Sequence, residues 1–380
     1  MTDLTGLKLW KLRDMRGKLV RIANEFYKNL IVIEGIPCSL GAGGRRFKSC
    51  HPDFIEAILI MNKIQYFLLF VIFLVSCDDR IGQPIPPEPN TTYKPGNIYG
   101  NPLGHIKYLV GNTPIVISIP HGGSLTPSTI PVINPELYQE INTKELSERL
   151  VYHIFELTGG KYPHVIYSNV HPSHFNVDTT LVEGTANNTY AVQGYTSYHS
   201  FLETAVDTVL SQFPVGFLID LHAENSHSQE VEIGYGLSKV ELDLTNGALN
   251  EEGLQSVSTI QQYVQISSSF FSDIIRGGSS LGSKISSETY YYVNPGGAST
   301  TFQFDVVPGV QIPQVHSDYK LKSYTSKLYH QTKGINSFTL SFPVDNSINS
   351  AAAYNAFAFL FVKNLRSSVL SFTQIDILGE

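Results

Sequence analysis

The chain has 380 residues, 42% of them hydrophobic and 11% aromatic, which is enough apolar material for a core in one large domain or two small ones. This composition excludes a disordered protein. The net charge is −7, but residues 1–60 carry ten Lys and Arg against six Asp and Glu, so the remaining residues carry a net charge of −11. A protein that binds a phosphate backbone shows the opposite sign, so we expect no nucleic-acid partner.

Residues 61–77, MNKIQYFLLFVIFLVSC, contain an unbroken apolar run from Tyr66 to Val75 after a single lysine. This run is too short to span a bilayer comfortably and is typical of a secretory signal. The last four residues, LVSC, resemble the bacterial lipoprotein cleavage box, in which the cysteine receives the lipid and becomes the mature N-terminus. We therefore expect a lipoprotein signal peptide over 61–77, lipidation at Cys77, and a protein of the bacterial cell envelope that is anchored to a membrane by its lipid.

A signal of this kind acts at an N-terminus, so we expect translation to start at Met61 and residues 1–60 to be a non-native upstream extension. Within them, SLGAGGRRFKSCHPDF resembles the translation of a transfer-RNA gene. The alternative is a basic N-terminal extension followed by a signal-anchor helix. Residues 78–104 are rich in Pro, Gly and Asn, which predicts a flexible tether between the anchor and a folded domain over 105–375.

Within this domain short apolar runs alternate with longer amphipathic ones, which predicts an α/β protein with three layers, α/β/α, around a mixed and mostly parallel sheet. The expected strands are 106–110, 114–120, 164–170, 216–222, 230–238 and 335–343. The expected helices are 142–160, capped at Thr143, then 192–213, 252–264, 267–275 and 349–372. Residues 276–284 are expected to form a Gly/Ser-rich joint, and residues 288–334 a long ordered excursion.

Histidines end two of the predicted strands. His121 follows the strand 114–120, and Asp220-Leu221-His222 closes the strand 216–222. Carboxyl ends of parallel strands meet at one edge of a sheet, where α/β proteins place their sites. The three cysteines all lie at or before Cys77, so the chemistry of the domain has to come from His, Asp, Glu, Ser or a metal.

His121 and His222 are therefore predicted to bind one zinc ion, with a carboxylate or a third histidine completing the protein ligands and water in the fourth position. Such a zinc lowers the pKa of the water and polarises an amide carbonyl. The alternative is a pair of turn and strand-edge histidines that only form hydrogen bonds.

The order of motifs from about residue 106 to about residue 345 resembles the N-formylglutamate amidohydrolase family, which is related to zinc carboxypeptidases. The matching segments are IPHGGSLTPSTIP, then INTKELSERLVYHIFELTGGKYPHVIYSNVHPSHFNVDTTLVEGT, YHSFLE, LIDLHAENSHSQEVEIGYGLS, IRGGSSLGS and YTSKLYHQTKGINSFTLSFP. The resemblance implies a single α/β/α domain and a zinc site to which His121 and His222 contribute.

The sequence differs from that family at the positions expected to bind the substrate carboxylate and to supply the general base. The arginines expected to hold a substrate carboxylate are replaced, by Pro172 after His171 and by Thr179 in the segment FNVDTT. Only arginine offers a carboxylate a bidentate fork. Asn142 stands where an acidic residue is usual, and Ser341 where the late strand often carries a glutamate suited to act as general base. A serine cannot replace that base at neutral pH.

Four further residues are assigned to the site. We assign Glu224 and His330 to catalysis. Glu224 is expected to be the base or the third metal ligand, and His227 is the alternative residue for these roles. His330 is included because the resembled family keeps a histidine at this position. We assign His171 and Lys327 to substrate binding, with Lys327 acting as a point charge as Lys320 or Lys322 also could.

The sequence thus predicts a zinc-dependent amidohydrolase-like envelope lipoprotein that acts on an N-acyl amino acid or a peptide-like amide. The alternative is a catalytically impaired pseudoenzyme that binds a ligand or a protein partner through the inherited pocket. A structural or adhesive envelope protein is least favoured, because it leaves the two strand-end histidines unexplained.

Overall fold

A computed structural model describes residues 92–224, 230–293, 297, 299–310, 315, 319, 322–343 and 350–379, all of which belong to the compact unit Asp78–Glu380. The predictions for residues 1–60, for the signal 61–77 and for lipidation at Cys77 lie outside the described residues. So does the first part of the predicted tether, residues 78–91. The last part of that tether contributes a strand, so the ordered domain begins before residue 105.

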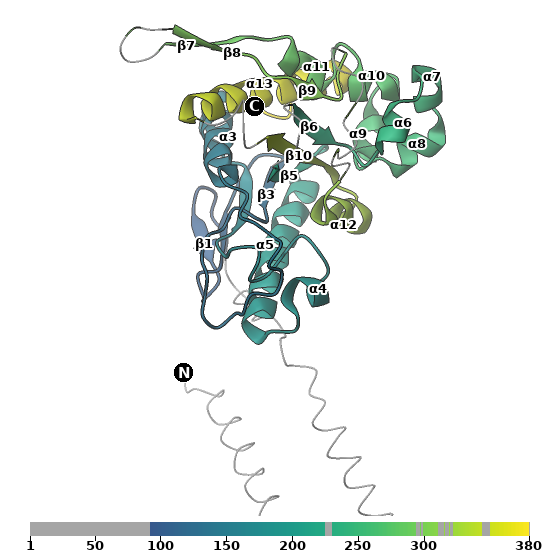
Figure 1. Ribbon diagram of the computed structural model, residues 1–380. Coiled ribbons are helices and arrows are strands. Elements are labelled where there is room, and N and C mark those ends of the chain that lie inside the picture. Colours follow the sequence, from purple (N-terminus) through teal and green to yellow (C-terminus); the bar gives the residue numbers. More distant parts are fainter. Residues whose placement is uncertain are drawn as a thin grey trace, which may run out of the picture. The chain divides into compact units, whose positions relative to one another are not determined.

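The domain is built on a mixed sheet of eight strands in the order β1-β2-β4-β3-β5-β10-β6-β9 (Figure 1). The four central strands β4, β3, β5 and β10 are parallel to their neighbours within this group, and the antiparallel pairs are β1–β2, β2–β4 and β6–β10. The bounds are β1 Ile98–Gly100, β2 Ile106–Leu109, β3 Ile115–Ile119, β4 His164–Ser168, β5 Phe217–Glu224, β6 Val231–Gly234, β9 Val306–Val307 and β10 Asn336–Pro343. The predicted fold class, three layers around a mostly parallel sheet, is confirmed.

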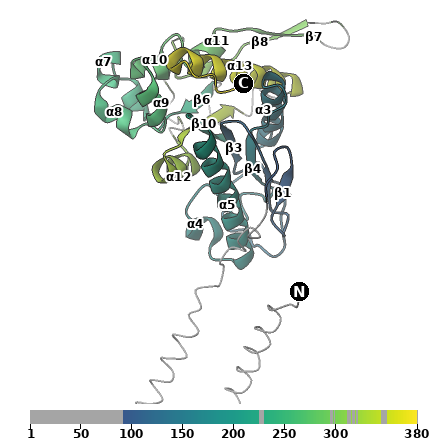
Figure 2. The ribbon, with the colours of Figure 1, turned by 180° about the vertical axis from the view of Figure 1, so that it is seen from behind.

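Helices cover both faces of the sheet, and the residues of β3 are buried on both sides (Figures 1 and 2). On one face Ile115, Ile117 and Ile119 share a core with α3 Thr143–Leu157 and α13 Ala351–Thr373. On the other face Val116 and Leu218 share a core with α5 Thr189–Gln212 and α12 Tyr324–Lys333. Among the helices described, none combines the length and the apolar character needed to cross a bilayer.

Smaller elements depart from the sequence predictions. The helix expected over 252–264 is two short helices separated at 258–260, and the Gly/Ser-rich joint 276–284 contains the start of a helix that Ser280 caps. The excursion 288–334 holds a projecting hairpin and also helix α12, which is capped by the side chain of Ser323 and ended by Gly334 in the left-handed region. The remaining bounds are α4 Leu181–Thr185, α6 Lys239–Leu242, α7 Asn246–Leu249, α8 Glu252–Val257, α9 Gln261–Ile266, α10 Phe271–Arg276, α11 Leu281–Ser286, β7 Tyr290–Val293 and β8 Ser299–Phe302.

The N-cap of α3 also differs from the prediction. The cap is Asn142, whose backbone lies in the left-handed region at φ 74° and whose side chain makes no capping hydrogen bond. Thr143 is the first helical residue, and its hydroxyl donates to the carbonyl oxygen of Glu140 at 2.9 Å. The start of α3 therefore fixes the loop segment that carries Glu140.

Acidification is expected to destabilise the domain through His164 at the start of β4. Its Nδ1 accepts hydrogen bonds from the Tyr108 hydroxyl and the Gly111 N–H, and burial lowers its pKa to about 4. The folded state binds this proton less tightly than the unfolded chain does. The free energy of unfolding is therefore unaffected by His164 above about pH 6.5 and falls by up to roughly 3 kcal/mol as the pH drops toward 4. Urea unfolding at pH 7.5 and 4.5 measures the loss.

The variant His164→Asn keeps an acceptor for Tyr108 but has no group that titrates in this range, so its free energy of unfolding should depend less on pH than that of the wild type. An equal pH dependence in both proteins would show that His164 does not carry the effect.

Candidate metal centre

The candidate site lies at the carboxyl edge of strands β3 and β5, which are parallel neighbours with Ser118 beside Asp220 in register. His121 follows β3 by two residues. His222 lies two residues before the end of β5 and two residues after Asp220, on the same face of the sheet. The ring centroids of His121 and His222 are 5.3 Å apart. The topology therefore brings together the two histidines that the sequence places at strand ends.

A third side chain, Glu140, joins the two imidazoles. Its Oε1 lies 2.8 Å from Nδ1 of His121 and 3.0 Å from Nδ1 of His222, and its Oε2 accepts the backbone N–H of Ala223 at 3.0 Å. One potential ligand atom from each of the three residues lies within 4.8 Å of the others. All three are buried, with exposures of 8% for His121, 5% for Glu140 and 0% for His222.

The opposite nitrogen of each imidazole is held by an acceptor. Nε2 of His121 lies 2.7 Å from Oδ1 of Asn176, whose orientation is fixed because the same oxygen accepts the N–H of Asp178 at 2.8 Å. Nε2 of His222 lies 3.1 Å from Oδ2 of Asp220. Both Nε2 atoms therefore carry the hydrogen, and in a neutral imidazole Nδ1 is left with its lone pair.

Three acceptor atoms then converge, the two Nδ1 lone pairs and Oε1 of Glu140. The repulsion within such a group is relieved either by protonation of the imidazoles, which then pair with the Glu140 carboxylate, or by a cation bound between the acceptors. Two histidines and one carboxylate are also the ligand set of catalytic zinc sites, and outer acceptors on the second imidazole nitrogen are a regular feature of histidine ligation. The group can hold a metal ion.

Charge around the centre is strongly negative despite burial. Burial alone would raise the pKa of the Glu140 carboxyl, but the neighbouring imidazoles of His222 and His121 hold that pKa well below its usual range. Burial likewise opposes ionisation of Asp220, and His222 together with the hydroxyl of Ser118 lowers its pKa. Asp178 adds a third carboxylate, 3.8 Å from Nε2 of His222. A divalent cation would be favoured by this excess of negative charge.

Glu140 is the residue that the sequence prediction missed. The expected position for an acid was Asn142, two residues later, but Asn142 serves as the N-cap of α3. Glu140 lies outside every helix and strand, and its backbone N–H bonds to the carbonyl oxygen of His121 at 3.0 Å. A carboxylate two residues before the expected position was the only available signal.

The other predicted site residues have partners outside this group. His330 lies near the C-terminal end of α12, where Nδ1 bonds to the carbonyl oxygen of Ile335 at 3.2 Å. His171 bonds to the hydroxyl of Ser173 at 2.8 Å, and Lys327 is exposed on α12. None of the three contacts His121, Glu140 or His222 among the described residues, and their roles stay predictions. The side chain of Glu224 and all of His227 lie outside the described part of the chain.

Helix α12 contacts the centre through its other end. The backbone N–H of Thr325, in the first turn, donates to Oδ1 of Asp178 at 2.7 Å. His330 lies five residues further along, so it is about 7.5 Å down the axis and on a different side of the helix. This spacing explains why the helix supports the site while His330 does not reach it.

Ser341 on β10 lies beside His222 on β5 and beside Glu232 on β6. Paired residues on neighbouring strands point to the same face of the sheet, so the three form a row across the carboxyl edge. The Ser341 hydroxyl is buried and has no hydrogen-bond partner among the described residues. The position next to His222 therefore holds no proton acceptor suited to neutral pH.

Neither a protein-family model nor a curated protein matches the sequence. Solved structures with a similar fold include a gene product of Agrobacterium tumefaciens, at 8% identity and a TM-score of 0.39 over 69% of this chain and 94% of that one. A second is N-formylglutamate amidohydrolase from Ralstonia eutropha JMP134, at 12% identity and a TM-score of 0.38 over 70% of this chain and 97% of that one. A third is a metallo-carboxypeptidase from Burkholderia cenocepacia, at 10% identity and a TM-score of 0.32 over 70% of this chain and 61% of that one. These values show a distant likeness in fold and assign neither a family nor a function.

Proposed function

We propose that the domain is a zinc-dependent hydrolase that cleaves the amide bond of an N-acyl amino acid or a peptide-like ligand. One observation carries the proposal: Nδ1 of both His121 and His222 faces Oε1 of Glu140, while both Nε2 atoms are committed to other acceptors. When both imidazoles are neutral these three atoms are all acceptors toward one another, and a bound cation satisfies all of them at once.

The residues around the centre have separable tasks in this proposal. His121, Glu140 and His222 bind the ion, and Asn176 and Asp220 hold the two imidazoles in the required tautomer and orientation. When bound, zinc supplies Lewis acidity, which acidifies a water molecule and polarises an amide carbonyl. The buried setting excludes bulk water and strengthens each of these interactions.

A pseudoenzyme that binds its ligand without turning it over is the second candidate, and Ser341 favours it. The hydroxyl of Ser341 beside His222 cannot accept a proton from water at neutral pH. The next residue in the row that has a carboxylate is Glu232, which lies one strand further from His222. The same zinc site would then serve to bind the ligand.

The proposal also includes the location. The apolar run of residues 61–77 and the cysteine at its end support a lipid-anchored protein of the bacterial cell envelope, with a small acyl amino acid or peptide-like compound as its ligand.

Metal analysis combined with an amidase assay tests the two candidates. The full chain, equilibrated with zinc and dialysed, is expected to retain about one ion per chain. It should release amine from N-formyl or N-acetyl amino acids or from short peptides, lose that activity with a chelator and regain it with zinc. Turnover that persists in chelator would contradict a metal-dependent hydrolase. Full zinc loading without turnover of any of these substrates would favour the pseudoenzyme.

A further inference from the structure

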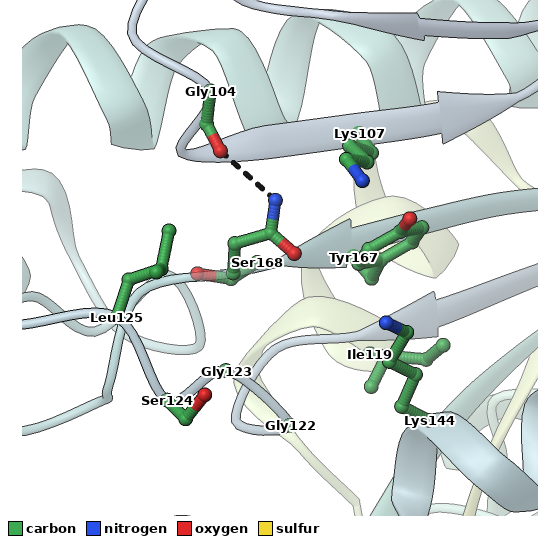
Figure 3. Close-up of a pocket in the computed structure, with 11 residues that line it drawn as sticks. Gly104, Lys107, Ile119, Gly122, Gly123, Ser124, Leu125, Lys144, Tyr167 and Ser168 are labelled. Carbon is green, nitrogen blue, oxygen red and sulfur yellow. Dashed lines mark hydrogen bonds between the residues drawn. The ribbon is translucent and has the colours of Figure 1, made fainter.

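A cavity of about 390 Å³ opens on the side of the sheet that α3 covers (Figure 3). Its wall combines the loop after His121, the ends of β2 and β4, and the first turn of α3. Ile119 and Tyr167, which line it, pack against the core shared with α3 and α13. The volume falls in the range of about 300–1,000 Å³ that is typical of small-molecule sites.

Two lysines flank the ring of Tyr167 in this cavity. The ammonium nitrogens of Lys107 and Lys144 lie 5.8 Å and 5.6 Å from the ring centroid, on either side of the side chain as Figure 3 shows. Neither ammonium forms an ion pair or a hydrogen bond with any residue that the structure describes. Both cations therefore border one cavity without an ion pair to offset them, and an anionic ligand in the cavity would be attracted by both.

The position of Lys144 is unfavourable for the helix that carries it. It is the second residue of α3, a helix of fifteen residues, where the positive end of the helix dipole disfavours a cation. A ligand with negative charge in the cavity turns the same placement into a favourable one.

Backbone lines the opposite wall. Gly122, Gly123 and Ser124 line the cavity, and within the described ranges no backbone hydrogen bond is donated by their three N–H groups. A Cβ on Gly123 would lie 2.2 Å from the backbone of Asn169, and a Cβ on Gly122 would lie 2.6 Å from the hydroxyl of Thr143. The loop can lie this close only because both residues are glycine. Successive free N–H groups beside cations are a common setting for phosphate.

We propose that this cavity binds the phosphate group of a small phosphorylated ligand. Two separate ammonium groups act as point charges and suit a dianionic phosphate, whereas a carboxylate is best matched by the fork of an arginine, which the lining lacks. The volume exceeds that of a phosphate ion, so an organic group of the ligand has room beside the Tyr167 ring.

This site is separate from the metal centre. None of its lining residues is a potential metal ligand, and Asp220 and Ser118, which support the centre, face the other side of the sheet from Ile119. The two sites share only the loop that begins at His121. The inference therefore stands whether or not the protein hydrolyses amides.

Calorimetry with phenyl phosphate tests the proposal on the full chain, at low ionic strength and in EDTA so that no metal contributes. Lys107→Met and Lys144→Met are each expected to weaken binding by roughly tenfold or more, because each removes one charged hydrogen-bond donor. Lys94→Met, which removes an exposed lysine outside the cavity, should bind as the wild type does. Inorganic phosphate should bind more weakly than phenyl phosphate, and benzoate more weakly still.

Three results would overturn the proposal: affinity for phenyl phosphate unchanged in both cavity variants, benzoate bound as tightly as phenyl phosphate, or binding that disappears in EDTA. Circular dichroism of each variant checks that it is folded. Because both lysine side chains reach solvent, replacement by methionine is expected to preserve the fold.

Discussion

Glu140→Gln is expected to lower the zinc affinity of the protein by more than the roughly 10- to 100-fold that loss of an outer partner typically costs. The substitution removes the charge from the one side chain that contacts both imidazoles, at 2.8 Å and 3.0 Å, and leaves a neutral oxygen of nearly the same size. That oxygen can still accept the N–H of Ala223, so the fold should be retained. Competition with a chromophoric zinc chelator measures the affinity.

Glu136→Gln is the matched control, because it makes the same change at an exposed position in the same segment. Zinc at 100 times the wild-type dissociation constant should stabilise the wild type and this control by about 2.7 kcal/mol through mass action, and should stabilise Glu140→Gln by at most about 0.4 kcal/mol. Equal zinc affinity in the two variants would mean that Glu140 only forms hydrogen bonds and that the centre is not a metal site.

His121 and His222 could be predicted because strand ends are visible in the sequence. Apolar runs with a histidine at their C-terminal end identify residues that meet at one edge of a parallel sheet, and the structure brings these two imidazoles to 5.3 Å between centroids. Glu140 could not be found in this way, because a loop residue is positioned by contacts that are distant in sequence. In this case those contacts are the start of α3 and the backbone of β5.

The segment FNVDTT has a role that the sequence does not predict. Its lack of arginine predicts the loss of a substrate anchor, and this stays a prediction. In the structure Asn176 binds Nε2 of His121, and Asp178 lies near Nε2 of His222 while accepting the N–H of Thr325. The residues therefore support both imidazoles, a role that depends on which strand ends they approach and not on a local pattern.

The sequence predicts the elements that have a strong hydrophobic pattern, but not a short helix whose start depends on a capping side chain. The central strands are apolar runs, and α5 and α13 are long enough for their apolar faces to identify them. Helix α12 is short and polar, and its start is marked by a cap in which the side chain of Ser323 accepts the N–H of Ser326. Since α12 supplies the contact to Asp178, part of the site depends on an element that the hydrophobic pattern does not reveal.

N-formylglutamate is expected to be hydrolysed poorly or not at all by the wild type, even with zinc bound. Ser341 lies next to His222, where the resemblance predicts a general base, and loss of a general base typically costs about 10²–10⁴-fold in rate. Thr179 stands where the resemblance predicts an arginine that orients the substrate carboxylate, and loss of orientation lowers the rate further. Ser341→Glu should therefore raise the turnover of formyl and acyl amino acids more than it changes their binding, whereas Thr179→Arg should mainly improve the binding of acidic substrates.

Ser341→Gln separates a base from a merely larger side chain, because glutamine has nearly the same size as glutamate and accepts no proton at neutral pH. The expected order of kcat is Ser341→Glu above Ser341→Gln, with the latter no higher than the wild type. Robust turnover of N-formylglutamate by the wild type would refute this account. It would mean that another acid acts as base, either Glu224, as the sequence predicts, or Glu232, which follows Ser341 in the row across the sheet. If Glu232 is that base, Glu232→Gln should abolish the wild-type activity while leaving zinc binding intact, since Glu232 is not among the proposed metal ligands His121, Glu140 and His222.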